Sequence, residues 1–262
     1  MLLPLLLFLQ PSVLDNWRAE IEKLDQSKVL IMRVTEDMPP PEDPAARSII
    51  TQVFQSPGFT SQFARAEAMS VNNGKYHFVL INPAHTTESN YDAVLAHELG
   101  HLWLKAQGYP SPVYQGGDAG CLAVNAGDVV QHVLIRAEMD RRRIDWRGHW
   151  LENLAKASEH MEADGLTQPV APICQRLAQL ALWSDVKLGL NPASWNGYER
   201  FEKAMKATFP ELSRPAEAIS GHLARLDLKD KAIHRQALVF SFQRMKSAGI
   251  EIDRKPNETK TP

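Results

Sequence analysis

Apolar and polar residues follow two different periods along this chain. In the first third, residues 28–34 (KVLIMRV) and 76–81 (YHFVLI) are short apolar runs rich in β-branched and aromatic residues, a pattern typical of strands. The pair Asn73-Gly74 separates the second run from residues 65–71, and both of its residues tolerate the positive φ of a tight turn. We therefore expect a small sheet that contains a hairpin.

Other segments of the first third have apolar residues at the three- and four-residue spacing that is typical of helices. Residues 15–24 and 45–55 are expected to be helices, the first with Asp15 as its cap. A third helix is expected to end near residue 107, with Ser89 and Asp92 as its capping box and Gly108 as its stop. The buried stripe of this helix recurs at three- and four-residue steps and consists of Val94, Leu95, Leu99, Leu102 and Ala106.

Beyond residue 123 the pattern is helical almost to the end. The expected helices are 124–143, 150–162, 170–188, 194–207, 216–226 and 231–248. Strands in the first third followed by helices predict an α+β fold rather than a βαβ alternation. We divide the chain into an apolar N-terminal segment (1–12), an α+β part (13–110), a helical part (111–254) and a disordered polar tail (255–262).

Composition excludes several classes of partner. The 262 residues are 44% apolar and 23% charged, with a net charge of -2, which is ordinary for a globular protein and favours no nucleic-acid partner. The arginines at 141–143 lie between the acidic residues Asp140 and Asp145, as on a solvated helix face. The apolar run 1–9 is too short to span a bilayer. Cytoplasmic location and export through this run as a weak signal both stay open, as does the oligomeric state.

The two cysteines, Cys121 and Cys174, are too few for a disulfide scaffold and lack the Cys-x-x-Cys spacing. They are consistent with two core thiols or with one bridge. We favour thiols, because a domain of this size does not need a covalent staple.

The segment Ala96 to Trp103 (AHELGHLW) carries the pattern His-Glu-x-x-His inside the third expected helix. Residues four apart stand on one face of a helix, so His97 and His101 can reach a single ion about 2 Å from each nitrogen, as zinc requires. Glu98 lies about 100° further round the helix, from where its carboxylate can accept a proton from a zinc-activated water. Gly100 leaves room beside the metal.

The strand 76–81, the helix after it and the run AHELGHLWL together resemble the core of the zincin metallopeptidases, over roughly a tenth of the chain. The resemblance is to the superfamily rather than to a close family. It implies a small N-terminal sheet with an active-site helix, bound Zn²⁺ and a peptide or protein substrate. It also implies that strand 76–81 is an edge strand on which an extended peptide is bound.

A catalytic zinc usually has three protein ligands. The third histidine of the metzincins is missing after His101, so we expect a ligand from a later helix, as in the gluzincin branch. Residues 127–140, within the expected helix 124–143, include three candidate ligands: His132, Asp128 and Glu138. We favour His132, because an imidazole among valines and isoleucines costs free energy unless it has a partner. Asp128 is then an orienting carboxylate or the ligand itself, and Glu138 the third choice.

These observations predict a zinc-dependent hydrolase, a metallopeptidase with His97, His101 and His132 as ligands and Glu98 as general base. One alternative is a zincin-like domain that binds metal and regulates a partner without catalysis. The other is a helical interaction protein in which the pattern occurs by accident. Retention of Glu98 favours catalysis, because a structural zinc site needs no base.

Overall fold

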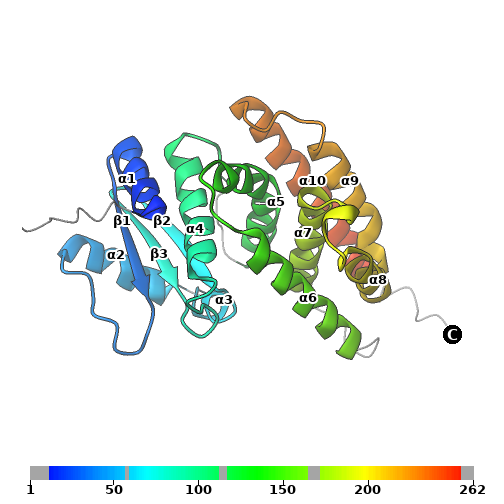
Figure 1. Ribbon diagram of the computed structural model, residues 1–262, viewed down its shortest axis with the longest axis horizontal. Coiled ribbons are helices and arrows are strands. Elements are labelled where there is room, and N and C mark those ends of the chain that lie inside the picture. Colours follow the sequence, from blue (N-terminus) through cyan, green and yellow to red (C-terminus); the bar gives the residue numbers. More distant parts are fainter. Residues whose placement is uncertain (1–11, 57–58, 112–116, 165–171, 255–262) are drawn as a thin grey trace, which may run out of the picture. The chain divides into compact units, whose positions relative to one another are not determined.

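The computed structural model describes residues 12–56, 59–111, 117–164 and 172–254 (Figure 1). The chain divides into two compact units, Met1–Gln107 and Gly108–Pro262. The first is mixed α and β and the second is helical, so the α+β class is confirmed. The apolar run 1–9 and the tail 255–262 lie outside the described residues.

The first unit contains a three-stranded sheet in the order β1-β3-β2, formed by β1 (Lys28–Arg33), β2 (Ala68–Asn73) and β3 (Tyr76–Ile81). β1 runs parallel to β3, and β2 runs antiparallel to it as the other arm of the hairpin. β3 is therefore the central strand, and all six of its residues are buried. The expectation that this strand is a peptide-binding edge is wrong, because β1 and β2 already pair with both of its sides.

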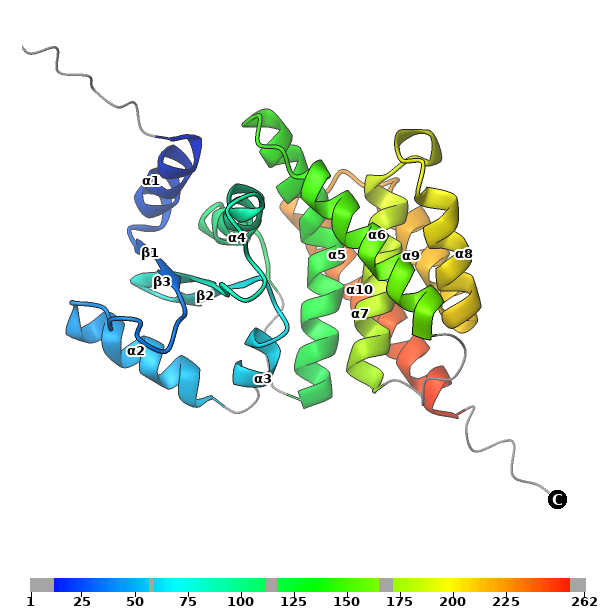
Figure 2. The ribbon, with the colours of Figure 1, turned by 60° about the horizontal axis from the view of Figure 1, so that its bottom comes forward.

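Helices cover both faces of this sheet: α1 (Val13–Asp25), α2 (Pro44–Gln55), α3 (Phe59–Phe63) and α4 (Tyr91–Ala106). Figure 2 shows α2 on one side of the strands and α1 with α4 on the other. The core on the α2 and α3 side is formed by Ala46, Ile50, Phe59, Phe63, Tyr76, Phe78 and Leu80. Because strand side chains alternate between faces, Phe78 and Leu80 point to this core and His77 to the α1 side, where its Nε2 lies 2.8 Å from Asp25 Oδ2.

The structure corrects some of the expected helix caps and the expected hairpin turn. The cap of α1 is Ser12, three residues before the expected cap Asp15, and Asp15 is instead the partner of Ser12 in a capping box. Asn90 precedes α4 without a side-chain cap bond, so the Ser89 capping box is wrong. The hairpin turn has Gly74 at its first central position with φ +57°, since Asn73 still pairs with Tyr76.

The second unit consists of α5 (Gly117–Arg141), α6 (Arg147–Asp164), α7 (Ile173–Gly189), α8 (Tyr198–Thr208), α9 (Ser213–Leu223) and α10 (Lys231–Arg254), with single turns η2 (Pro192–Ser194) and η3 (Pro210–Leu212). α5 packs on α7 and α10, α7 on α9, and α6 on α8. Each expected helix is present with shifted ends, because apolar periodicity defines the buried face better than the termini. No helix in the described part of the chain has the length and apolar character to cross a membrane.

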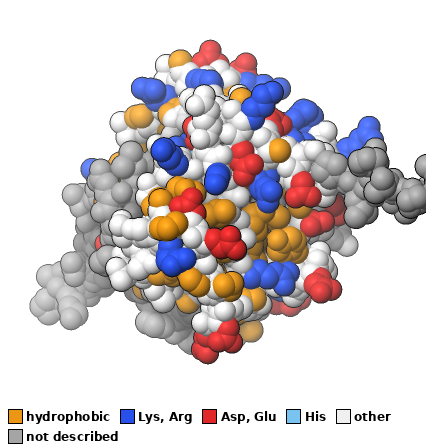
Figure 3. Space-filling view, turned by 90° about the vertical axis from the view of Figure 1, so that its left-hand side faces the viewer, with side chains coloured by type: hydrophobic (Ala, Val, Ile, Leu, Met, Phe, Trp, Pro, Cys, Tyr) orange, Lys and Arg blue, Asp and Glu red, His pale blue; other side chains and the backbone are white. Residues whose placement is uncertain are grey.

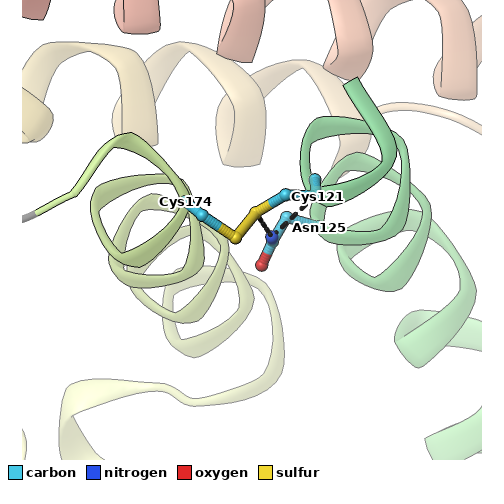
Figure 4. The surroundings of a disulfide bond; sticks show 3 residues. All are labelled: Cys121, Asn125 and Cys174. Atoms are coloured by element: carbon cyan, nitrogen blue, oxygen red, sulfur yellow. Dashed lines mark hydrogen bonds between the residues drawn. A yellow bond between two sulfur atoms is a disulfide. The ribbon is translucent and has the colours of Figure 1, made fainter. Parts of the chain in front are cut away.

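Cys121 of α5 and Cys174 of α7 form a disulfide with a Cα–Cα distance of 5.7 Å (Figure 4). The Asn125 amide donates to the Cys121 carbonyl at 2.8 Å and reaches its sulfur at 3.3 Å. The expectation of two thiols is therefore wrong. The bridge joins the two helices at their N-terminal ends, which are far apart in sequence and were not paired by any sequence signal.

The surface agrees with the weak net charge. On the face that Figure 3 shows, acidic and basic side chains are interspersed among apolar ones. Arg147, at the start of α6, is paired with Asp140 at 2.7 Å, as expected of a helix face with charges of both signs. Arg142, in contrast, is buried against Glu138, with only 8% of its side chain exposed.

Candidate metal centre

α4 carries the His-Glu-x-x-His pattern in its middle. The helix runs without interruption from Tyr91 to Ala106 and ends before Gly108, whose φ of +77° is the left-handed stop expected from the sequence. Most of its surface is covered, since the apolar positions on both sides of the pattern are buried. The helix is therefore held as a rigid support, and the side chains of His97 and His101 remain partly exposed on it.

The two imidazoles face one another across one helical turn. His97 Nε2 and His101 Nε2 are 3.2 Å apart, and the ring planes cross at 77°. Two nitrogens each about 2.05 Å from a tetrahedral zinc ion would be separated by about 3.3 Å. The separation of these two nitrogens therefore fits a shared ion without any movement of the helix.

Glu98 follows His97 on the same helix and is buried, with 8% of its surface exposed. A carboxylate is found at this depth only where the surroundings supply partners or a function, because desolvating its charge is costly. The first unit thus brings together three of the four residues that the sequence singled out: two candidate ligands and the candidate base.

His132 lies on α5 in the second unit, where its side chain is 18% exposed. Its Nδ1 is 3.1 Å from Oδ2 of Asp185 on α7. Burial disfavours the imidazolium, but the charge and hydrogen bond of Asp185 outweigh burial, and the pKa of His132 is raised above its ordinary value.

Asp185 is in turn held by Arg136, one turn beyond His132 on α5. The guanidinium donates from Nη1 to Oδ2 and from Nη2 to Oδ1, both at 2.7 Å. Burial acts to raise the pKa of the Asp185 carboxyl, yet the charges of Arg136 and His132 keep that pKa far below its usual range. Asp185 is therefore ionised at neutral pH.

The other two candidate ligands differ in their surroundings. The Glu138 carboxylate accepts hydrogen bonds from Arg141 and Arg142 on its own helix, which satisfies both of its oxygens and disfavours it as a ligand. Asp128 is half-buried one turn before His132, and its charge contributes to the raised pKa of that histidine. Both expected roles of Asp128, the orienting carboxylate and the ligand itself, therefore stay predictions.

Asp185 and Arg136 were missed by reasoning from the sequence. A signal was present, because Asp185 interrupts the apolar stretch LALWSDVKLGL, where a carboxylate needs a partner. Asp185 resembles His132 in this respect, since both are polar residues in apolar surroundings.

No family model, curated protein or solved structure matches this chain.

Proposed function

We propose that this protein is a zinc-dependent hydrolase that cleaves peptide bonds, with His97 and His101 as metal ligands and Glu98 as general base. The observation that carries the proposal is the 3.2 Å separation of the two Nε2 atoms on one buried helix. Imidazole nitrogens suit several transition metals, and zinc is the one that suits hydrolysis without redox chemistry. The peptide as substrate rests on the resemblance of AHELGHLWL to the zincins alone, because β3 is central rather than the edge strand that this resemblance implies.

The proposal includes His132 as the third ligand. His97, His101 and His132 are a set that could hold a metal ion. The contact from His132 Nδ1 to Asp185 favours Nε2 as the ligand atom, as is usual where a carboxylate holds the other ring nitrogen. Three histidines leave one position of a tetrahedral ion for water, which distinguishes a catalytic site from a closed structural one.

The chemistry follows from the positions of these side chains. Zinc, when bound, lowers the pKa of a water molecule towards neutrality and polarises the carbonyl oxygen of the substrate. Glu98 would accept a proton from that water as the water oxygen bonds to the carbonyl carbon. Glu98 would then donate this proton to the amide nitrogen as the C–N bond breaks, which would release a carboxylic acid and an amine.

Substitution of the base tests this proposal. The wild-type protein is expected to retain stoichiometric zinc and to cleave members of a fluorescence-quenched peptide library. Glu98→Gln keeps the shape of the side chain, so it should keep the metal but reduce kcat by about 10²- to 10⁴-fold. Glu36→Gln makes the same change at an exposed position of the same unit and should have no effect.

Each outcome bears on a different part of the proposal. Wild-type turnover by Glu98→Gln would refute the assignment of the base. Zinc bound without turnover on the library would overturn the hydrolase in favour of a regulatory metal-binding domain. If neither zinc nor Co²⁺ binds, or if His97→Ala binds as tightly as wild type, the metal centre itself is wrong.

A further inference from the structure

The helices α5 and α7 of the second unit run parallel, and contacting residues of the two helices are separated by the same number of positions in the sequence. The disulfide joins Cys121 to Cys174 and the polar contact joins His132 to Asp185, and both pairs are separated by 53 residues. The two contacts are eleven residue steps apart in each helix, which is three turns or about 16 Å. The covalent bridge therefore sets the register of α5 against α7, and this register brings Asp185 opposite His132.

The Asp185 carboxylate has little freedom. Its side chain is 8% exposed, and the two bonds from Arg136 fix the plane of the carboxylate. The guanidinium is itself packed over the rings of Trp150 and Trp146, with centroids at 4.8 and 5.5 Å. A Cβ added at Gly189 would lie 3.1 Å from the guanidinium carbon, so the backbone of α7 also packs closely against the Arg136 guanidinium.

Both oxygens of Asp185 accept hydrogen bonds from Arg136, so the carboxylate acts as an acceptor. The proton between Asp185 and His132 must therefore belong to the histidine, on Nδ1. In the neutral imidazole this places the lone pair on Nε2, and the rigid carboxylate sets the direction in which that lone pair points.

We propose that Asp185 is the positioning residue of the metal centre: it selects the tautomer of His132 and aims Nε2 at the ion. This inference rests on the proposed function, since it assigns a role towards the same ion. A competing explanation is that Asp185 is present only to neutralise the buried charge of Arg136. The two explanations differ in what happens once Arg136 is removed.

The metal affinity of the full chain distinguishes these two explanations. The apo-protein is titrated with Co²⁺, whose visible absorption reports both affinity and coordination, in four forms: wild type, Asp185→Asn, Arg136→Met and the double variant Arg136→Met with Asp185→Leu. Asp185→Asn should lose about 10- to 100-fold in affinity. Arg136→Met keeps the carboxylate but removes the two bonds that fix its plane, so it should lose less affinity than Asp185→Asn. The double variant has no unpaired charge and should still show the loss.

A matched control comes from the first unit, where His77 and Asp25 form another histidine–carboxylate contact at 2.8 Å. Asp25→Asn removes the charge from that contact and should leave the Co²⁺ affinity unchanged. Circular dichroism of each apo-protein establishes that a loss of affinity is not a loss of fold.

The outcomes distinguish this inference from the proposed function. If the wild type binds no Co²⁺ or Zn²⁺, the metal centre is wrong and this inference fails with it. If the wild type binds and the double variant matches it in affinity and spectrum, Asp185 serves only to balance charge, and the positioning role alone is overturned. If the double variant still binds Co²⁺ more weakly than wild type and its Co²⁺ spectrum is altered, the positioning role of Asp185 is supported.

Discussion

Removal of the Cys121–Cys174 disulfide is expected to destabilise the second unit by about 4 kcal/mol. The bridge closes a loop of 53 residues, and the chain-entropy model gives about that free energy for a loop of this length. For a unit of this size each kcal/mol shifts the thermal midpoint by roughly 2–4 °C, so a decrease of about 8–16 °C is expected. Most of the effect comes from the greater freedom of the unfolded chain.

Thermal unfolding of the double variant Cys121→Ala with Cys174→Ala measures this decrease. Alanine avoids adding a buried hydroxyl, because Cys121 is only 5% exposed. Wild-type protein treated with a phosphine reductant should match the variant, and the reductant should leave the variant unchanged. Two free thiols in freshly unfolded, unreduced wild-type protein, or equal midpoints for wild type and variant, would refute the reasoning.

Two further predictions concern pH and metal. Burial lowers the pKa of His77 despite the opposing effect of Asp25, so the folded state favours the neutral ring. The stabilisation from this neutral ring is fully present above the pKa of the unfolded state, about 6.5, and is lost as the pH falls through the folded-state pKa. Urea unfolding between pH 7 and 5 should therefore show a smaller acid loss in His77→Gln than in wild type, and equal slopes would contradict this. Zinc at 100 times its Kd should stabilise the folded chain by about 2.7 kcal/mol, a gain that chelation reverses and that is missing in His97→Ala.

The parts of the fold that sequence predicts are those set by neighbouring residues. The strand Tyr76–Ile81, the helix Tyr91–Ala106 and its stop at Gly108 follow from apolar periodicity and from backbone freedom at one glycine. The order of the strands does not follow, because periodicity is silent about which strands pair. The resemblance to the zincins implied an edge position for β3, whereas β3 is the central strand.

The same distinction applies to the metal centre. His97 and His101 are one turn apart, so the 3.6-residue period alone places their rings together, and the 3.2 Å separation agrees. Asp185 meets His132 across 53 residues, and the cysteines meet across the same interval. Such contacts depend on how two helices pack, which the pattern of a single helix does not contain.

The Arg136–Asp185 pair is difficult to explain by stability alone. Replacing a buried ion pair with apolar residues is often neutral or stabilising by about 1–4 kcal/mol, because desolvation offsets the attraction. An interface between α5 and α7 already fixed by a disulfide needs no such pair to set its register. The double variant Arg136→Met with Asp185→Leu should therefore unfold, as apo-protein, at or above the wild-type temperature while binding the ion more weakly. A variant that instead loses stability and keeps its affinity would mean that the pair belongs to the fold rather than to the metal centre.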